Sequence, residues 1–196
     1  MDHETALAHI QELSALTPPV ELQTVYLTPS SVSNTSPNAD VDLDTPDELA
    51  VRSLILGIVH RTLGDYKGSR ILFDDALRHW REAETNSWIG GVTYFELAVL
   101  DMKDGERAAA EAGVAAQDDE GDKSCYNVDG VGEEDSGKGT VLDTWRRAIR
   151  SAREALQKAH ALCTREADLS SRLDSRVVML RQEIEVKMRM VGISDV

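Results

Sequence analysis

The most restrictive feature of this sequence is where its prolines lie. All five occur within the first 46 residues, so the 150 residues after Pro46 contain none. Proline interrupts helices because it lacks an N–H group and its ring clashes with the preceding turn. Through the proline-free stretch, Leu, Ala, Val and Ile recur at spacings of three and four, as in amphipathic helices. We therefore predict an all-α protein.

The spacing of apolar residues also predicts where the helices lie. We expect helices over residues 3–16, 46–63, 67–84, 88–103, 142–163 and 167–191. The last of these repeats apolar residues from Leu169 to Val191 in steps of three and four, which places them along a narrow seam. Residues 106–116 are rich in alanine, and the pattern leaves open whether they form a separate helix.

Local signals mark the helix ends. Thr45, Pro46 and Glu48 have the arrangement of an N-cap, a first helical position and the acid of a capping box. Gly64 is expected to end the same helix, since glycine readily adopts the left-handed conformation of a C-terminal cap. By the same reasoning, we predict that the helix over 88–103 stops at Asp104-Gly105.

The negative charge is concentrated in two segments. The chain has a formal charge of −14, and its acidic runs at 38–48 (five acids, no base) and 117–139 (eight acids, two lysines) together contribute −11. Polar residues dominate there and apolar anchors are few, so we predict disorder over 28–46 and about 117–140. Phosphate backbones would repel such a chain, which argues against nucleic-acid binding.

These segments divide the chain into three parts. We expect a short helix within 1–27, a linker at 28–46, and a helical domain at 47–196 with the acidic insertion inside it. Because the first helix begins almost at Met1, we expect the natural chain to start further upstream. No stretch approaches the roughly 20 apolar residues of a membrane span, and the first residues lack the pattern of a secretory leader. The sequence therefore predicts a cytoplasmic protein.

An internal repeat relates two helical hairpins. Leu56-Gly57 and Gly64 are matched by Leu97-Ala98 and Gly105, each 41 residues later. A small residue at 57 or 98 lets two helices approach closely, and a glycine at 64 or 105 suits a turn. Repeats of this kind are typical of helical solenoids, in which each hairpin covers the apolar face of its neighbour.

The first hairpin resembles a tetratricopeptide repeat from Ala50 to Arg81. Leu56-Gly57 falls at the Leu-Gly of that repeat, Leu63-Gly64-Asp65-Tyr66 at its turn, and Phe73 and Ala76 at the knobs of its second helix. Ser69 and Arg81 depart from the pattern. In the second hairpin, the residue equivalent to Phe73 is Leu156, so the chain between Gly105 and Trp145 is expected to be an insertion, which costs little because loop closure depends only logarithmically on length.

Three runs in order resemble the C-terminal part of the tetratricopeptide repeat 39 family, whose fungal branch includes the inclusion body clearance proteins. The runs are Leu56-Gly57-Ile58 through Leu63-Gly64-Asp65-Tyr66, Tyr94-Phe95-Glu96-Leu97-Ala98, and Arg153-Glu154-Ala155-Leu156 leading to Leu169-Ser170-Ser171-Arg172-Leu173. The resemblance covers about 49–185. It implies a non-catalytic adaptor in protein quality control that works with lipid droplets. It also implies the nucleus, the lipid-droplet surface or the mitochondrial outer membrane surface as locations.

No motif for catalysis or cofactor binding meets its requirements. Residues 132–138 have the outline of a phosphate-binding loop, but Gly139 stands where Ser or Thr must hold magnesium. The acids at 40–44 imitate a calcium loop, but its turn glycine and closing glutamate are missing. The histidines and the two cysteines lack metal-ligand spacing. We therefore expect no catalytic residue, no cofactor and no metal.

One of the three tryptophans is a candidate for partner contact. Trp80 and Trp145 lie on apolar stripes and are expected in the core. Trp88 precedes Gly90-Gly91 in what we expect to be a connection between hairpins. Because tryptophan is enriched in binding hot spots, Trp88 is the predicted surface contact.

The pattern favours two functions. The first is a protein–protein interaction scaffold, in which a right-handed stack of helix pairs receives a partner segment and the last helix caps the stack. The alternative is a self-associating structural protein, in which the segment from Leu169 to Val191 forms a coiled coil with a second copy. The partner's identity is not encoded in any motif of the chain.

Overall fold

The computed structural model describes residues 2–27, 43, 45–83, 87–118, 136–163 and 167–193. In these ranges it contains six α-helices and no β-strand, so the prediction of an all-α protein is confirmed. The helices are α1 (His3–Ser14), α2 (Pro46–Thr62), α3 (Tyr66–Glu82), α4 (Ser87–Asp118), α5 (Ser136–Cys163) and α6 (Ala167–Val191). Most of the predicted linker and of the acidic insertion, namely 28–42 and 119–135, lies outside the described residues.

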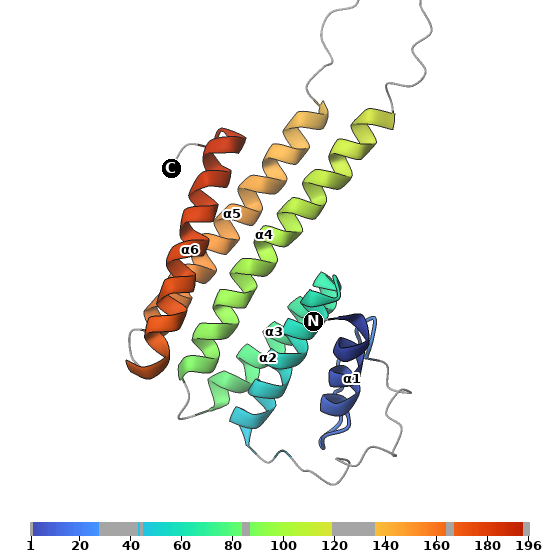
Figure 1. The fold of residues 1–196 in the computed structure, drawn as a ribbon, viewed down its shortest axis with the longest axis vertical. Helices are drawn as coiled ribbons and strands as arrows, with labels where there is room; N and C mark the ends of the chain where they lie inside the picture. The colour runs from blue at the N-terminus through green and yellow to red at the C-terminus, as the bar shows by residue number, and fades with distance from the viewer. Residues whose placement is uncertain are drawn as a thin grey trace, which may run out of the picture.

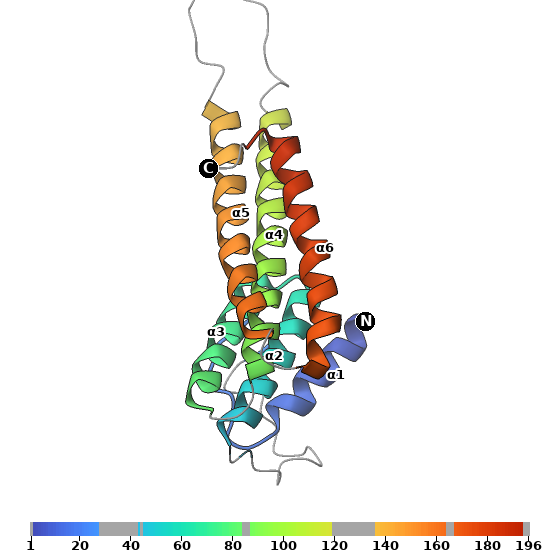
Figure 2. The same ribbon diagram turned by 90° about the vertical axis from the view of Figure 1, so that its left-hand side faces the viewer.

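The helices from α2 to α6 lie side by side, and each runs antiparallel to the next one in the chain (Figure 1). α2 and α3 form one hairpin, and the long helices α4 and α5 form another. α4 contacts both helices of the first hairpin, and α6 contacts both helices of the second. In the side view α3 and α5 lie on the side away from α6, so α2, α4 and α6 line one face (Figure 2).

Both ends of α2 have the predicted local structure. Thr45 Oγ1 accepts a hydrogen bond from the Glu48 N–H at 3.3 Å, and the Glu48 carboxylate accepts one from the Thr45 N–H at 3.1 Å, which completes the capping box. Gly64 has a φ of +81°, a conformation that favours glycine. The predicted start and end of this helix are therefore confirmed.

Gly57 brings α2 and α3 into close contact. A Cβ atom at this position would lie 2.6 Å from the ring of Phe73, which is fully buried. Ser69 of α3 donates its hydroxyl to the Gly57 carbonyl oxygen at 2.8 Å. The serine that departs from the tetratricopeptide pattern therefore adds a hydrogen bond where alanine would add none.

The predicted end of the helix over 88–103 at Asp104-Gly105 is wrong. α4 runs through Gly105 to Asp118, so residues 106–116 belong to the same helix. A Cβ atom on Gly105 would lie 2.9 Å from Cβ of Ala148 and 3.1 Å from the Trp145 ring, both on α5. The glycine thus permits a close helix crossing, and packing against α5 offsets the roughly 1 kcal/mol that glycine costs inside a helix.

The second long helix also begins earlier than predicted. α5 starts at Ser136, six residues before Leu142. The part of the predicted disordered insertion that falls at 117–118 and 136–140 is therefore helical. Extension of α4 and α5 past the end of α2 and α3 gives the second hairpin its greater length (Figure 1).

The N-terminal segment packs on the first hairpin. Ala6 and Ile10 of α1 and Leu27 join Leu56 and other residues of α2 and α3 in a small apolar cluster. The buried guanidinium of Arg52 donates to the carbonyl oxygens of Leu16 at 3.1 Å and Pro18 at 2.5 Å. Residues 2–27 are thus attached to the helical domain by both apolar and polar contacts.

The main core extends across the remaining helices. It joins residues of α2, α3, α4, α5 and α6 in one cluster, in which Phe73 and Leu156 are both buried. The seam of α6 belongs to this cluster. Leu173, Val177, Leu180, Ile184 and Met188 of the seam are buried, and Val191 at its end is partly buried against the same cluster. α6 therefore covers the second hairpin with the side that the sequence singled out.

Candidate protein-binding groove

The residues of the repeat motif build the scaffold and face inward. Those with buried side chains are Leu56, Phe73, Ala76, Leu97, Ala98 and Leu156. Tyr66 is partly buried against the core, and the Arg107 guanidinium lies 5.2 Å from its ring centroid. Gly57 and Gly105 allow neighbouring helices to pack closely, and Gly64 forms the turn between α2 and α3. These residues fix how the helices are placed. Leu156 also contributes to the floor of a groove between α5 and α6, and the others line neither of the two grooves described below.

Trp88 lies in a different setting from the one predicted. It is in the first turn of α4 instead of a connection between hairpins, and its ring is half-buried against the main core. Gly90, two residues further on, lets the Trp80 ring approach to 2.5 Å from where a Cβ would stand. Trp88 lines neither of the two grooves described below.

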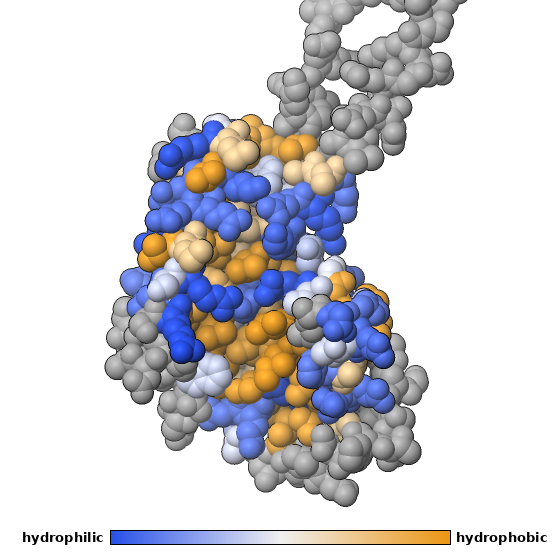
Figure 3. All heavy atoms as spheres, in the orientation of Figure 1, coloured by the Kyte–Doolittle hydropathy of each residue, from blue (hydrophilic) through white to orange (hydrophobic). Residues whose placement is uncertain are grey.

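An open groove runs between α4 and α6 on the face shared with α2. It has a volume of about 560 Å³. Its α4 wall consists of Phe95, Val99, Met102, Lys103 and Glu106, and its α6 wall of Arg176, Met179, Leu180, Gln182, Glu183 and Val186. We call this the α4–α6 groove. Figure 3 shows apolar side chains gathered on this face of the molecule, where α4 lies between α6 and α2.

Two apolar side chains of the groove are largely exposed. Met179 is 69% exposed and Val186 is 51% exposed, whereas most large apolar side chains of the described chain are buried. Ile55 of α2 adds further exposed apolar surface. Exposed apolar residues that cluster in a groove with charged groups at its rim are typical of protein-interaction sites.

Charged side chains connect the α4 wall of the groove to its α6 wall. The Arg176 guanidinium lies 4.6 Å from the centroid of the Phe95 ring, a cation–π contact between α6 and α4. At the other end, Glu106 accepts a hydrogen bond from Lys103 at 2.8 Å and pairs with Lys187 of α6 at 3.2 Å. The bond from Lys103, with that from Lys187, lowers the pKa of Glu106 and keeps it ionised.

A buried carboxylate connects the three helices of this face. The Glu96 side chain of α4 is only 4% exposed, and its Oε2 accepts a hydrogen bond from Arg61 of α2 at 2.7 Å. Its Oε1 lies 3.5 Å from a guanidinium nitrogen of Arg176 on α6. Both oxygens of one carboxylate therefore tie α2, α4 and α6 together.

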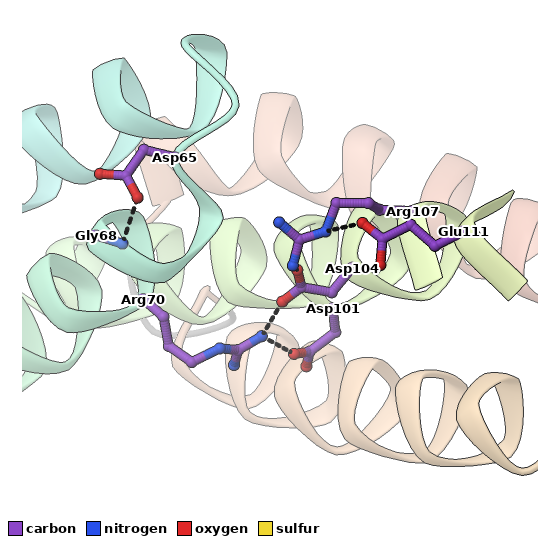
Figure 4. Close-up of polar contacts among 7 residues, drawn as sticks. All are labelled: Asp65, Gly68, Arg70, Asp101, Asp104, Arg107 and Glu111. Atoms are coloured by element: carbon purple, nitrogen blue, oxygen red, sulfur yellow. Dashed lines mark hydrogen bonds and ion pairs between the residues drawn. The ribbon is translucent and has the colours of Figure 1, made fainter. Parts of the chain in front are cut away.

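The first hairpin is held to α4 by a second set of polar contacts (Figure 4). Arg70 of α3 reaches Asp101 at 2.5 Å and Asp104 at 3.2 Å, one turn apart on α4. Asp65 caps α3 by accepting from the Gly68 N–H at 2.9 Å. These contacts explain how a face built from separate hairpins keeps a defined shape.

The two grooves offer surface for binding. Within the described residues, no group of three or more His, Cys, Asp or Glu side chains is placed to hold a metal ion. No helix in the same part of the chain is long and apolar enough to span a membrane. Comparisons with models of protein families, with curated proteins and with solved structures find no match.

Sequence reasoning missed the two exposed apolar residues of the α4–α6 groove. Met179 and Val186 are seven residues apart on α6, which places them on one side of the helix but off the seam. The sequence pattern that could have identified them is a second, shorter row of apolar residues beside the seam of α6. Whether that row faces solvent or a neighbouring helix depends on how α6 is rotated on α4 and α5, which the sequence pattern alone does not specify.

Proposed function

We propose that this chain is a protein–protein interaction scaffold of the tetratricopeptide type and has no catalytic activity. The α4–α6 groove receives a segment of a partner protein with large apolar side chains. The groove's rim carries two basic and two acidic groups, so charged residues of the partner segment set its direction. The exposure of Met179 and Val186 on the walls of this groove is the observation that carries the proposal.

The helix contacts support a solenoid. α4 packs against both α2 and α3, and α6 repeats this relation against α4 and α5. In a stack of this kind each added helix fills the crease of the preceding pair, and the first helices of successive pairs line one face. α2, α4 and α6 then correspond to the first helices, and the groove lies on the face that they form.

Selection of peptides from a random displayed library on the whole chain tests the proposal. The selected peptides are expected to share apolar anchors at helical or alternate spacing. Met179→Glu and Val186→Glu should each weaken binding of a selected peptide at least about tenfold, because a buried charge opposes an apolar anchor. Binding is measured by fluorescence anisotropy of the labelled peptide.

Two variants on the same helix serve as matched controls. Val178 is 50% exposed and Met190 is 75% exposed, and neither lines the groove. Val178→Glu and Met190→Glu should therefore leave peptide affinity unchanged. If they weaken binding as much as Met179→Glu does, or if no peptide is selected against the groove, the proposal is wrong.

The resemblance to inclusion body clearance proteins suggests the setting of this binding. Under that resemblance, the partner is a component of protein quality control in the cytoplasm or at the lipid-droplet surface. The alternative of self-association through α6 receives less support, because the seam from Leu173 to Met188 is buried against the chain's own helices. A coiled coil with a second copy would have to uncover it.

A further inference from the structure

A second groove lies between α5 and α6, and no residue of α4 lines it. It has a volume of about 1010 Å³. Buried apolar side chains, among them Ile149 and Ile184, form its floor. α6 is the last helix of the described chain, and the groove is the crease that a further helix of the stack would fill. We call it the α5–α6 groove.

The rim of this groove is basic in an otherwise acidic protein. Four arginines line it, Arg146, Arg150 and Arg153 from α5 and Arg181 from α6, against two carboxylates, Glu154 and Glu185. The formal charge of its lining is thus +2, whereas that of the chain is −14. No structural role within the described residues accounts for this concentration of positive charge in one groove.

Ion pairs among the described residues leave part of this positive charge without a partner. Arg146 pairs with Asp143 at 3.0 Å, but Glu185 is itself 3.9 Å from Arg189, an arginine outside the groove. For Arg150 and Arg181, which face each other's helices across the crease, the described part of the chain shows no ion pair. Both side chains are exposed, so their guanidinium groups can reach a ligand.

We propose that the α5–α6 groove binds an acidic helical segment of a partner protein. A guanidinium group holds a carboxylate with two parallel hydrogen bonds, so arginines on both walls can grip acidic residues one turn apart on a docked helix. Apolar residues on the opposite side of that helix would rest on the floor. A nucleic acid is disfavoured, because its phosphates would meet the field of a chain with a net charge of −14. This site is separate from the α4–α6 groove and does not depend on it.

The probe is a synthetic helix-forming peptide of about 16 residues, with glutamate along one side and leucine along the other. Its matched partner carries glutamine at every glutamate position. The full chain should bind the glutamate peptide about tenfold more tightly than the glutamine peptide, and this difference should disappear near 1 M salt, where charges are screened within about 3 Å. Isothermal titration calorimetry measures both affinities.

Charge reversal locates the site. The double variant Arg150→Glu with Arg181→Glu should bind the glutamate peptide at least about tenfold more weakly than the wild type does. The same variant should bind tightly to a version of the peptide with lysine at the glutamate positions. Arg147→Glu with Arg172→Glu is the control, since both are exposed arginines on the same two helices, lie outside the groove and change the net charge equally. Thermal unfolding followed by circular dichroism confirms that both double variants fold.

Three results would overturn the proposal. The first is equal affinity for the glutamate and glutamine peptides. The second is an equal loss of affinity in the groove and control variants. The third is that the chain binds the glutamate peptide only after its own acids within 118–135 are changed to amides, since the groove would then belong to that segment.

Discussion

Arg61 and Glu96, 35 residues apart in the chain, form a hydrogen-bonded ion pair of 2.7 Å between α2 and α4. The carboxylate is almost fully buried, while the guanidinium keeps partial contact with solvent. Arg176 of α6 approaches the other oxygen of the same carboxylate. One acidic side chain thus fixes the relative placement of the three helices on the proposed binding face.

Removal of this charge should weaken the fold. Glu96→Gln leaves two guanidinium groups without their counter-charge, and we expect the free energy of unfolding to fall by about 3 kcal/mol. Glu111→Gln removes an exposed acid that is 3.7 Å from Arg107 on the same helix, and should cost less than about 1 kcal/mol. Urea unfolding followed by circular dichroism measures both. Equal losses would mean that the Glu96 pair has no special role.

The contact of Gly57 with Phe73 gives a second prediction. Gly57→Ala places a methyl group 2.6 Å from the buried ring, and should lower the free energy of unfolding by about 2 kcal/mol. Combining it with Phe73→Leu should make the joint loss smaller than the sum of the two single losses, because the smaller side chain leaves room for the methyl group.

Gly64→Ala is the control for this experiment. Nothing lies within 4 Å of a Cβ at position 64, but the φ of +81° strains any side chain there by about 1 kcal/mol. Its loss should add to that of Phe73→Leu without coupling. Additive losses for Gly57→Ala and Phe73→Leu would contradict the proposed close contact.

His60 should make the stability depend on pH. Burial lowers its pKa from the usual 6.5, and this effect exceeds the opposing effect of the hydrogen bond to Asp65. The unfolded chain therefore binds the proton more readily than the folded chain, so the free energy of unfolding is highest above pH 6.5 and falls as the pH drops below it. Burial also lowers the pKa of His79, so this residue contributes to the same dependence of stability on pH.

Urea unfolding between about pH 7.5 and 5.5, a range that spans the usual pKa of histidine, measures this dependence. His60→Asn should flatten the fall in stability at acidic pH, whatever its effect at neutral pH. His160→Asn alters an exposed side chain and should keep the slope of the wild type. An unchanged slope in His60→Asn would show that His60 does not cause the loss.

The seam of α6 gives the last prediction. Ile184 is buried in the main core, so Ile184→Ala should lower the free energy of unfolding by about 3 kcal/mol while the mass in solution stays that of a single chain. Val178→Ala, on the exposed side of α6, should cost less than about 0.5 kcal/mol. Light scattering at several concentrations provides the second readout. A dimer that dissociates on Ile184→Ala would favour self-association instead.

Features encoded by neighbouring residues could be predicted from the sequence. The capping box of Thr45 and Glu48, the turn at Gly64 and the ends of α6 near 167 and 191 all depend on residues within a few positions of each other. Periodicity likewise predicted the buried seam of α6, because a run of apolar residues on one side of a helix must be covered by something.

The tertiary structure decided what each glycine does and which charges meet. Gly64 and Gly105 are equivalent in the sequence repeat, yet one ends a helix and the other lies inside α4 against Ala148. Only the approach of α5 makes the second outcome favourable, since glycine alone favours a helix end. The Arg61–Glu96 pair and both grooves likewise arise from helices far apart in the chain, whose rotation and spacing depend on the summed packing of the core.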